Sequence, residues 1–215
     1  MGGTDDIIVT AFSRRYNAAF ADVFTIEGGF VNDPSDRGGA TKYGVSLRFL
    51  VGEGRIDVDE DGVADFDLDM DGDIDVDDIR ALSPVDAKYL FQRCFWNRLG
   101  CENYPAPLGE AMFDQGVNGG NVAANKLLQR AVNKCLACYP GLRGRPNMLD
   151  DDGVIGAMTR TALDWVLKLP AAGMPLLIDQ YRQAAAERYR GIVDRDPSQR
   201  RFLDGWLRRA RELGR

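Results

Sequence analysis

Residues 27–44 read Glu-Gly-Gly-Phe-Val-Asn-Asp-Pro-Ser-Asp-Arg-Gly-Gly-Ala-Thr-Lys-Tyr-Gly, and this stretch interrupts a chain that is otherwise patterned for helices. It places one carboxylate at Glu27, a second at Asp36 nine residues later, and a hydroxyl at Thr41 five residues beyond that. Pairs of glycines on both sides of Asp36 let the backbone turn sharply around these three side chains. The stretch is therefore our candidate for the functional site.

The chain before this stretch, and again from residue 83 onward, has the apolar spacing of helices, while residues 28–56 are predicted to be loop and short extended segments. Residues 7–26 carry one apolar stripe, with Thr4 or Asp5 as the cap. Ser83, Pro84 and Asp86 form the start signal of a second helix, which we expect to run to about residue 96. Five further helices are predicted over residues 108–117, 121–138, 156–169, 174–193 and 197–213. Asn121 can cap the second of these, and its inward face should hold Leu127, Leu128, Ala131 and Val132. The buried face of the last should include Phe202. Strand signals are sparse, so the predicted fold class is mainly α.

Composition excludes several kinds of chemistry. The 215 residues include no histidine, which rules out Ser-His-Asp and Cys-His catalysis and leaves acid-base work to groups such as Asp and Glu. No apolar run reaches transmembrane length, so we expect no membrane insertion. No secretory signal follows the acidic N-terminus, which indicates cytoplasmic synthesis or a leader already removed. We expect a monomer that binds no nucleic acid.

The net charge of −6 hides an uneven distribution. Residues 57–78 hold twelve acids and no base, while the rest of the chain has 21 acids against 27 bases. The basic body suits an anionic polymer, although ordinary surface charge explains it equally well. The four cysteines at 94, 101, 135 and 138 leave open a zinc site, buried thiols or incidental pairing. Cys94 sits in an apolar helix beside Phe95 and Trp96, which favours a buried thiol there.

Glu27 and Asp36 are suited to an acid and base pair. Glu27 falls at the end of the first predicted helix, where the negative end of the helix dipole and nearby aromatic side chains favour the protonated acid. Asp36 lies in a polar, glycine-rich loop and should stay ionised, and Thr41 could hold a water molecule. Hydrolysis of a sugar polymer needs such a pair of carboxyl groups. The plainer alternative is a solvated helix end and a turn residue.

The acidic insert matches a calcium loop of twelve residues. The ligand positions of residues 67–78 are filled by Asp67, Asp69, Asp71, Asp73 through its carbonyl, Asp75 and Asp78. Gly72 stands at the sharp turn and Ile74 at the apolar eighth position. A first copy ten residues earlier contains Asp57, Asp59, Asp61, Gly62 and Asp65. It has Leu68 at the last ligand position, so it is degenerate or borrows Asp67. We expect structural Ca²⁺ here and no cofactor for catalysis; the alternative is a disordered acidic run.

Residues 27–44 resemble the opening motif of glycoside hydrolase family 108, the N-acetylmuramidase endolysin family. The spacing of the two acids and the hydroxyl is also similar to that of phage-type lysozymes, but one residue shorter before Thr41. Residues 87–96 resemble the family's helix with an aromatic-Trp end. Residues 113–120, Ala124, residues 128–131, residues 152–156, Thr159 and residues 162–163 resemble its peptidoglycan-binding region. Closing with Asp makes the calcium loop resemble that of dockerins.

The resemblance implies a lysozyme-like helical fold, with residues 1–104 as the catalytic region, the insert at 57–78, and residues 105–215 as a peptidoglycan-binding region packed on it. It implies cleavage of the bond between N-acetylmuramic acid and N-acetylglucosamine, with Glu27, Asp36 and Thr41 catalytic and Tyr43, Asp114 and Asn118 in contact with substrate. It also implies action on the cell wall, in the periplasm, after release or export. For Asp114 and Asn118, capping of a helix end is the alternative. A lytic transglycosylase and a non-catalytic protein that binds the wall or serves secretion remain the other functions.

Overall fold

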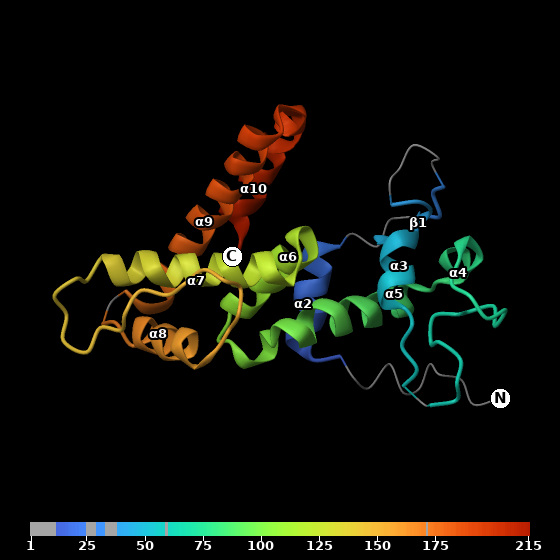
Figure 1. Ribbon diagram of the computed structural model, residues 1–215, viewed down its shortest axis with the longest axis horizontal. Helices are drawn as coiled ribbons and strands as arrows, with labels where there is room; N and C mark the ends of the chain where they lie inside the picture. The colour runs from blue at the N-terminus through green and yellow to red at the C-terminus, as the bar shows by residue number, and fades with distance from the viewer. Residues whose placement is uncertain (1–11, 25–28, 33–37, 59, 171) are drawn as a thin grey trace. The chain divides into compact units, whose positions relative to one another are not determined.

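The computed structural model describes residues 12–24, 29–32, 38–58, 60–170 and 172–215 (Figure 1). Glu27, Asp36 and Asp59 lie outside these ranges. The chain forms two compact units, residues 1–97 and residues 98–215. Helices dominate both units, and the described residues contain one small sheet of two strands, so the predicted mainly α class is confirmed.

The first unit contains α2 (Arg14–Val23), β1 (Thr41–Lys42), β2 (Val45–Ser46), α3 (Leu47–Glu53), α4 (Val76–Ala81), α5 (Pro84–Phe91) and the π-helix η1 (Gln92–Asn97). Its core is aromatic. Tyr16 is fully buried and packs against Trp96, with the rings tilted and their centroids 5.5 Å apart. Its hydroxyl donates a hydrogen bond to the Lys88 carbonyl at 2.5 Å. Phe24 and Phe91, with ring centroids 4.3 Å apart, join the end of α2 to α5. Helices α2 and α5 therefore pack together through aromatic rings.

Helix boundaries in the first unit follow their caps. Ser83 and Asp86 form the expected capping box at the start of α5, with Pro84 in the first turn. The first helix differs from expectation: α2 begins at Arg14, because the Ser13 side chain accepts a hydrogen bond from the Tyr16 amide. Two short helices were not expected. Ser46 caps α3, and Asp75 with Asp78 forms a capping box for α4.

The second unit contains the 3-10 helix η2 (Cys101–Asn103), α6 (Leu108–Gly119), α7 (Asn121–Ala137), α8 (Ala157–Leu167), α9 (Gly173–Arg195), the 3-10 helix η3 (Pro197–Phe202) and α10 (Leu203–Glu212). Helix α7 lies at its centre and packs against α6, α8 and α9. Its inward face is the predicted one, because Leu127, Leu128, Ala131 and Val132 are all buried. Helices α9 and α10 run side by side as a hairpin (Figure 1).

Three local expectations for the second unit are corrected. Asn121 is the first residue of α7, and Gly120, with a φ of 85°, takes the cap position instead. The last predicted helix is split into η3 and α10. Phe202, expected on its buried face, is 42% exposed because it ends η3 and stacks on Trp206 from outside.

None of the four cysteines, all of which the structure describes, forms a disulfide; three are buried and Cys138 is exposed. Burial raises the pKa of the Cys135 thiol to about 12, which keeps it protonated. No helix in the described ranges has both the length and the apolar character needed to cross a membrane.

Candidate functional site

Thr41 lies in a narrow ribbon made of the β1–β2 hairpin and the single bridge that Val31 forms with it. Its amide donates to the Val31 carbonyl at 2.7 Å, and the Val31 amide donates back to the Thr41 carbonyl at 2.9 Å. On its other side Thr41 pairs with Ser46 in the β1–β2 hairpin. The Thr41 hydroxyl donates to the Gly39 carbonyl at 3.3 Å and is partly exposed. The described part of the site is therefore a backbone that is hydrogen-bonded on both sides. Glu27 and Asp36 lie outside the described residues.

The hairpin turns at Tyr43 and Gly44, which both have positive φ, at 50° and 79°. A two-residue turn of this kind fits the twist of an antiparallel pair, but it strains a residue with a side chain. A Cβ on Gly44 would lie 3.0 Å from the Phe24 ring, so a larger residue would clash there. The turn holds Tyr43 at the tip of the hairpin, half-exposed, with the Lys42 ammonium 5.3 Å from its ring centroid. An aromatic ring presented in this way is suited to stack on a sugar.

The acidic insert folds as two loops with the same backbone. Glu60 and Met70, ten residues apart, both have a φ of 60°, and the glycines two positions later also have positive φ. Asp57 accepts hydrogen bonds from the amides of residues 61 and 62 at 3.1 and 3.0 Å. Asp67 accepts the equivalent bonds from residues 71 and 72 at 3.1 and 2.9 Å. The sequence repeat is thus a structural repeat.

The two loops are closed by different residues. In the second loop, Asp78 is 1% exposed and its carboxylate accepts the Leu68 amide at 2.6 Å. In the first loop, Asp65 accepts the equivalent bond from the Val58 amide at 3.1 Å. Asp65 thus closes the first loop, where the repeat has Leu68 at the twelfth position. The sequence showed that the first loop has no acidic residue at its twelfth position, but it did not show that Asp65 closes the loop instead.

The second loop has the geometry of a cation site. Carboxylate oxygens of Asp67, Asp69 and Asp71 all lie within 4.8 Å of one another. Two oxygens that bind one Ca²⁺ at about 2.4 Å can be at most about 4.8 Å apart, so this set fits a single ion. The neighbouring Asp71 carboxylate raises the pKa of Asp73, which shows that like charges are crowded together. Ile74 is buried, as expected of the eighth position.

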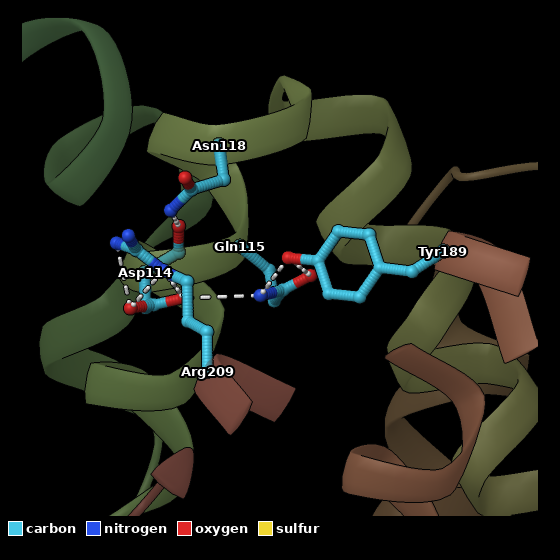
Figure 2. Close-up of polar contacts among 5 residues, drawn as sticks. All are labelled: Asp114, Gln115, Asn118, Tyr189 and Arg209. Carbon is cyan, nitrogen blue, oxygen red and sulfur yellow. Dashed lines mark hydrogen bonds and ion pairs between the residues drawn. The ribbon is translucent and has the colours of Figure 1, made fainter. Parts of the chain in front are cut away.

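In the second unit, Asp114 and Asn118 lie on α6 in a polar network (Figure 2). The Asp114 carboxylate accepts two hydrogen bonds from the Arg209 Nε, both at 3.0 Å, and its ion pair with Arg209 is 2.9 Å long. The buried Gln115 amide donates to both Asp114 and the Tyr189 hydroxyl at 3.0 Å. The exposed Asn118 amide donates to the Asp114 backbone carbonyl at 2.7 Å. The Asp114 side chain thus joins α6 to α10, and its contact with substrate stays a prediction.

Removing Arg209 tests this role of the ion pair. We expect Arg209→Met to lower the free energy of unfolding by about 1–2 kcal/mol, between the effects of exposed and buried pairs. The reason is that the Asp114 side chain, 17% exposed, would lose its charged partner. Urea unfolding is the measurement. Arg208→Met, at an exposed neighbouring position, is the matched control, and equal unfolding midpoints for the two variants would contradict the expectation.

Gln129 organises the loop before α8, a role that sequence reasoning did not assign although residues 128–131 were part of a resembling motif. Its amide donates to Asp152 at 2.8 Å and to the Val154 carbonyl at 3.1 Å, and its oxygen accepts the Gly153 amide at 2.8 Å. Gln129 is 1% exposed. The available signal was a polar residue among the inward-facing apolar residues of α7. The Asp-Gly motif at 152–153 is therefore held in place by a buried side chain.

Two family models match the chain, and their boundary falls inside the second compact unit. Residues 20–120 match the family model described as Glycosyl hydrolase 108, and residues 123–211 match the one described as Predicted Peptidoglycan domain. Among solved structures, the chain is similar to Brucella abortus SagA, with 24% identity, a TM-score of 0.55, and coverage of 99% of this chain and 98% of that one. This likeness shows a shared fold. No curated protein matches the chain.

Proposed function

We propose that this chain, which belongs to the glycosyl hydrolase 108 family, cleaves the β-1,4 bond between N-acetylmuramic acid and N-acetylglucosamine in peptidoglycan. Membership makes it a glycoside hydrolase of the lysozyme type, and the peptidoglycan domain makes peptidoglycan its partner in the cell wall. The observation that supports the proposal most is the position of the family match, because residues 20–120 include Glu27, Asp36 and Thr41.

In the proposed mechanism Glu27 is the general acid that protonates the leaving oxygen of the glycosidic bond. Asp36 stays ionised and either positions the attacking water or stabilises positive charge at the anomeric carbon. The Thr41 hydroxyl holds that water. The hydrogen bonds between Thr41 and Val31 support this role, because a fixed backbone keeps the hydroxyl in one place. Tyr43 at the hairpin tip stacks on a sugar ring of the glycan strand.

A lytic transglycosylase is the second candidate, since it would also use one glutamic acid. It closes an anhydro ring within the muramic acid and adds no water. Mass spectrometry of the released muropeptides separates the two reactions. Hydrolysis gives reducing ends, and we expect these to be the main product. Products lighter by one water would overturn the assignment, and the absence of any released fragment would favour a protein that only binds the wall.

We also propose that residues 67–78 bind one structural Ca²⁺. The side chains of Asp67, Asp69 and Asp71, the Asp73 carbonyl, and the side chains of Asp75 and Asp78 would be the ligands. The mutual distances of the first three carboxylates support this set. The first loop, with Asp57, Asp59, Asp61 and Asp65, would bind a second ion less tightly. The ion would order the insert, and the hydrolysis itself needs no metal.

A further inference from the structure

Helix α4 connects the acidic insert to the ribbon that contains Thr41. Its N-terminal end belongs to the second acidic loop, because Asp75 caps it and Asp78 accepts the amides of both Asp75 and Leu68. Its C-terminal end packs against β1. There the Lys42 ammonium donates a hydrogen bond to the Arg80 carbonyl. Carbonyls in the last turn of a helix lack partners within the helix, so a lysine at this end is doubly favourable.

Arg80 contacts the ribbon on both sides of the Val31–Thr41 bridge, at Phe30 and at Lys42. Its carbonyl accepts from Lys42, and its guanidinium lies 4.9 Å from the centroid of the Phe30 ring. Val31 and Thr41 form an antiparallel bridge, which places their neighbours Phe30 and Lys42 opposite each other. Arg80 of α4 therefore contacts two residues, Phe30 and Lys42, that lie opposite each other beside the bridge.

This arrangement places α4 on the side of the ribbon away from Thr41. Successive side chains of an extended strand point to opposite faces, so Phe30 and Lys42 share one face, while Val31 and Thr41 share the other. The Arg80 side chain is itself oriented by an ion pair with Asp77 one turn earlier on α4. The insert thus contacts the face of the ribbon opposite to the one that carries Val31 and Thr41.

We propose that Lys42 and Arg80 are positioning residues, through which the acidic insert holds the Thr41 ribbon in its working geometry. The contacts stand on the structure alone, whereas their consequence for catalysis rests on the proposed function. Loss of either contact would free the ribbon from α4 without touching the Thr41 hydroxyl. We therefore expect a lower kcat at an unchanged KM, and a response of the ribbon to Ca²⁺ that passes through these two residues.

Hydrogen exchange of the Val31 and Thr41 amides tests the proposal without reference to catalysis, because each donates to the other residue. In Lys42→Met we expect both amides to exchange about tenfold faster, the effect of losing one bond to a charged group. In Arg80→Met the backbone carbonyl remains, so we expect exchange only about threefold faster, the effect of losing the cation–π contact with Phe30. Lys42→Arg should restore slow exchange. Arg14→Met, at an exposed site on α2, is the matched control and should change nothing. Unchanged exchange in both Met variants would overturn the proposal.

The Phe24 amide, which bonds to the Phe20 carbonyl at 2.9 Å, is the internal reference. Faster exchange there as well would mean general destabilisation and would also overturn the positioning role. In the wild type, millimolar Ca²⁺ should slow exchange at Thr41 relative to chelator, and this difference should vanish in the double variant of Lys42 and Arg80. A Ca²⁺ effect that persists in the double variant, or none in the wild type, overturns the coupling. A wild type that releases no muropeptides contradicts the proposed function alone.

Discussion

Glu27→Gln is expected to give a folded protein that has lost nearly all lytic activity. The amide keeps the size of the side chain but cannot donate a proton to the leaving oxygen. Loss of general acid assistance costs about 10²–10⁴ in rate. The measurement is the fall in turbidity of purified peptidoglycan, with thermal unfolding of both proteins as the control for folding. If the variant lysed within a few-fold of the wild-type rate, the general acid would have to be another residue.

Asp36→Asn and Thr41→Ala are the matched comparisons for this prediction. Each acts on water or on charge, so each should lower turnover less than Glu27→Gln does. For Thr41→Ala the ribbon should persist, because its pairing with Val31 and Ser46 uses backbone groups only. A larger loss in either variant than in Glu27→Gln would mean that the roles are assigned to the wrong residues.

Millimolar Ca²⁺ is expected to raise the melting temperature of the protein, and chelator to lower it. A ligand that binds only the folded state stabilises it by about 2.7 kcal/mol at a hundredfold excess over its dissociation constant. The gain should be visible because the twelve acids of residues 57–78 repel one another without a cation. Activity should fall only in part with chelator, since Glu27 and Asp36 lie outside these loops in the sequence.

Equivalent positions in the two loops provide the control. Asp71→Asn in the second loop should remove most of the thermal response, whereas Asp61→Asn at the matching position of the first loop should remove less. Calorimetric titration of chelator-treated protein measures binding directly. No heat of binding together with an unchanged melt would contradict the calcium proposal. Complete and immediate loss of lysis in chelator would show that the insert also shapes the groove for substrate.

The sequence determined those features whose physical causes are local. Ser83, Pro84 and Asp86 cap α5 within four residues, so the start of that helix could be read directly. The inward face of α7 follows from helical period alone. The acidic repeat predicted two loops of one kind, because the positive φ of Gly62 and Gly72 is a requirement that glycine meets without strain.

Tertiary structure decided the contacts between distant segments. Asp114 pairs with Arg209, 95 residues later, and Lys42 meets the Arg80 carbonyl 38 residues away. No local rule distinguishes these charges from the solvated ones around them. The same holds for short elements such as α3 and α4, whose few residues gain too little from helix propensity and form because the surrounding structure packs against them. Sequence thus determined the chemistry that is available, and the fold determined which side chains meet, because pairing across a chain depends on packing that propensity does not encode.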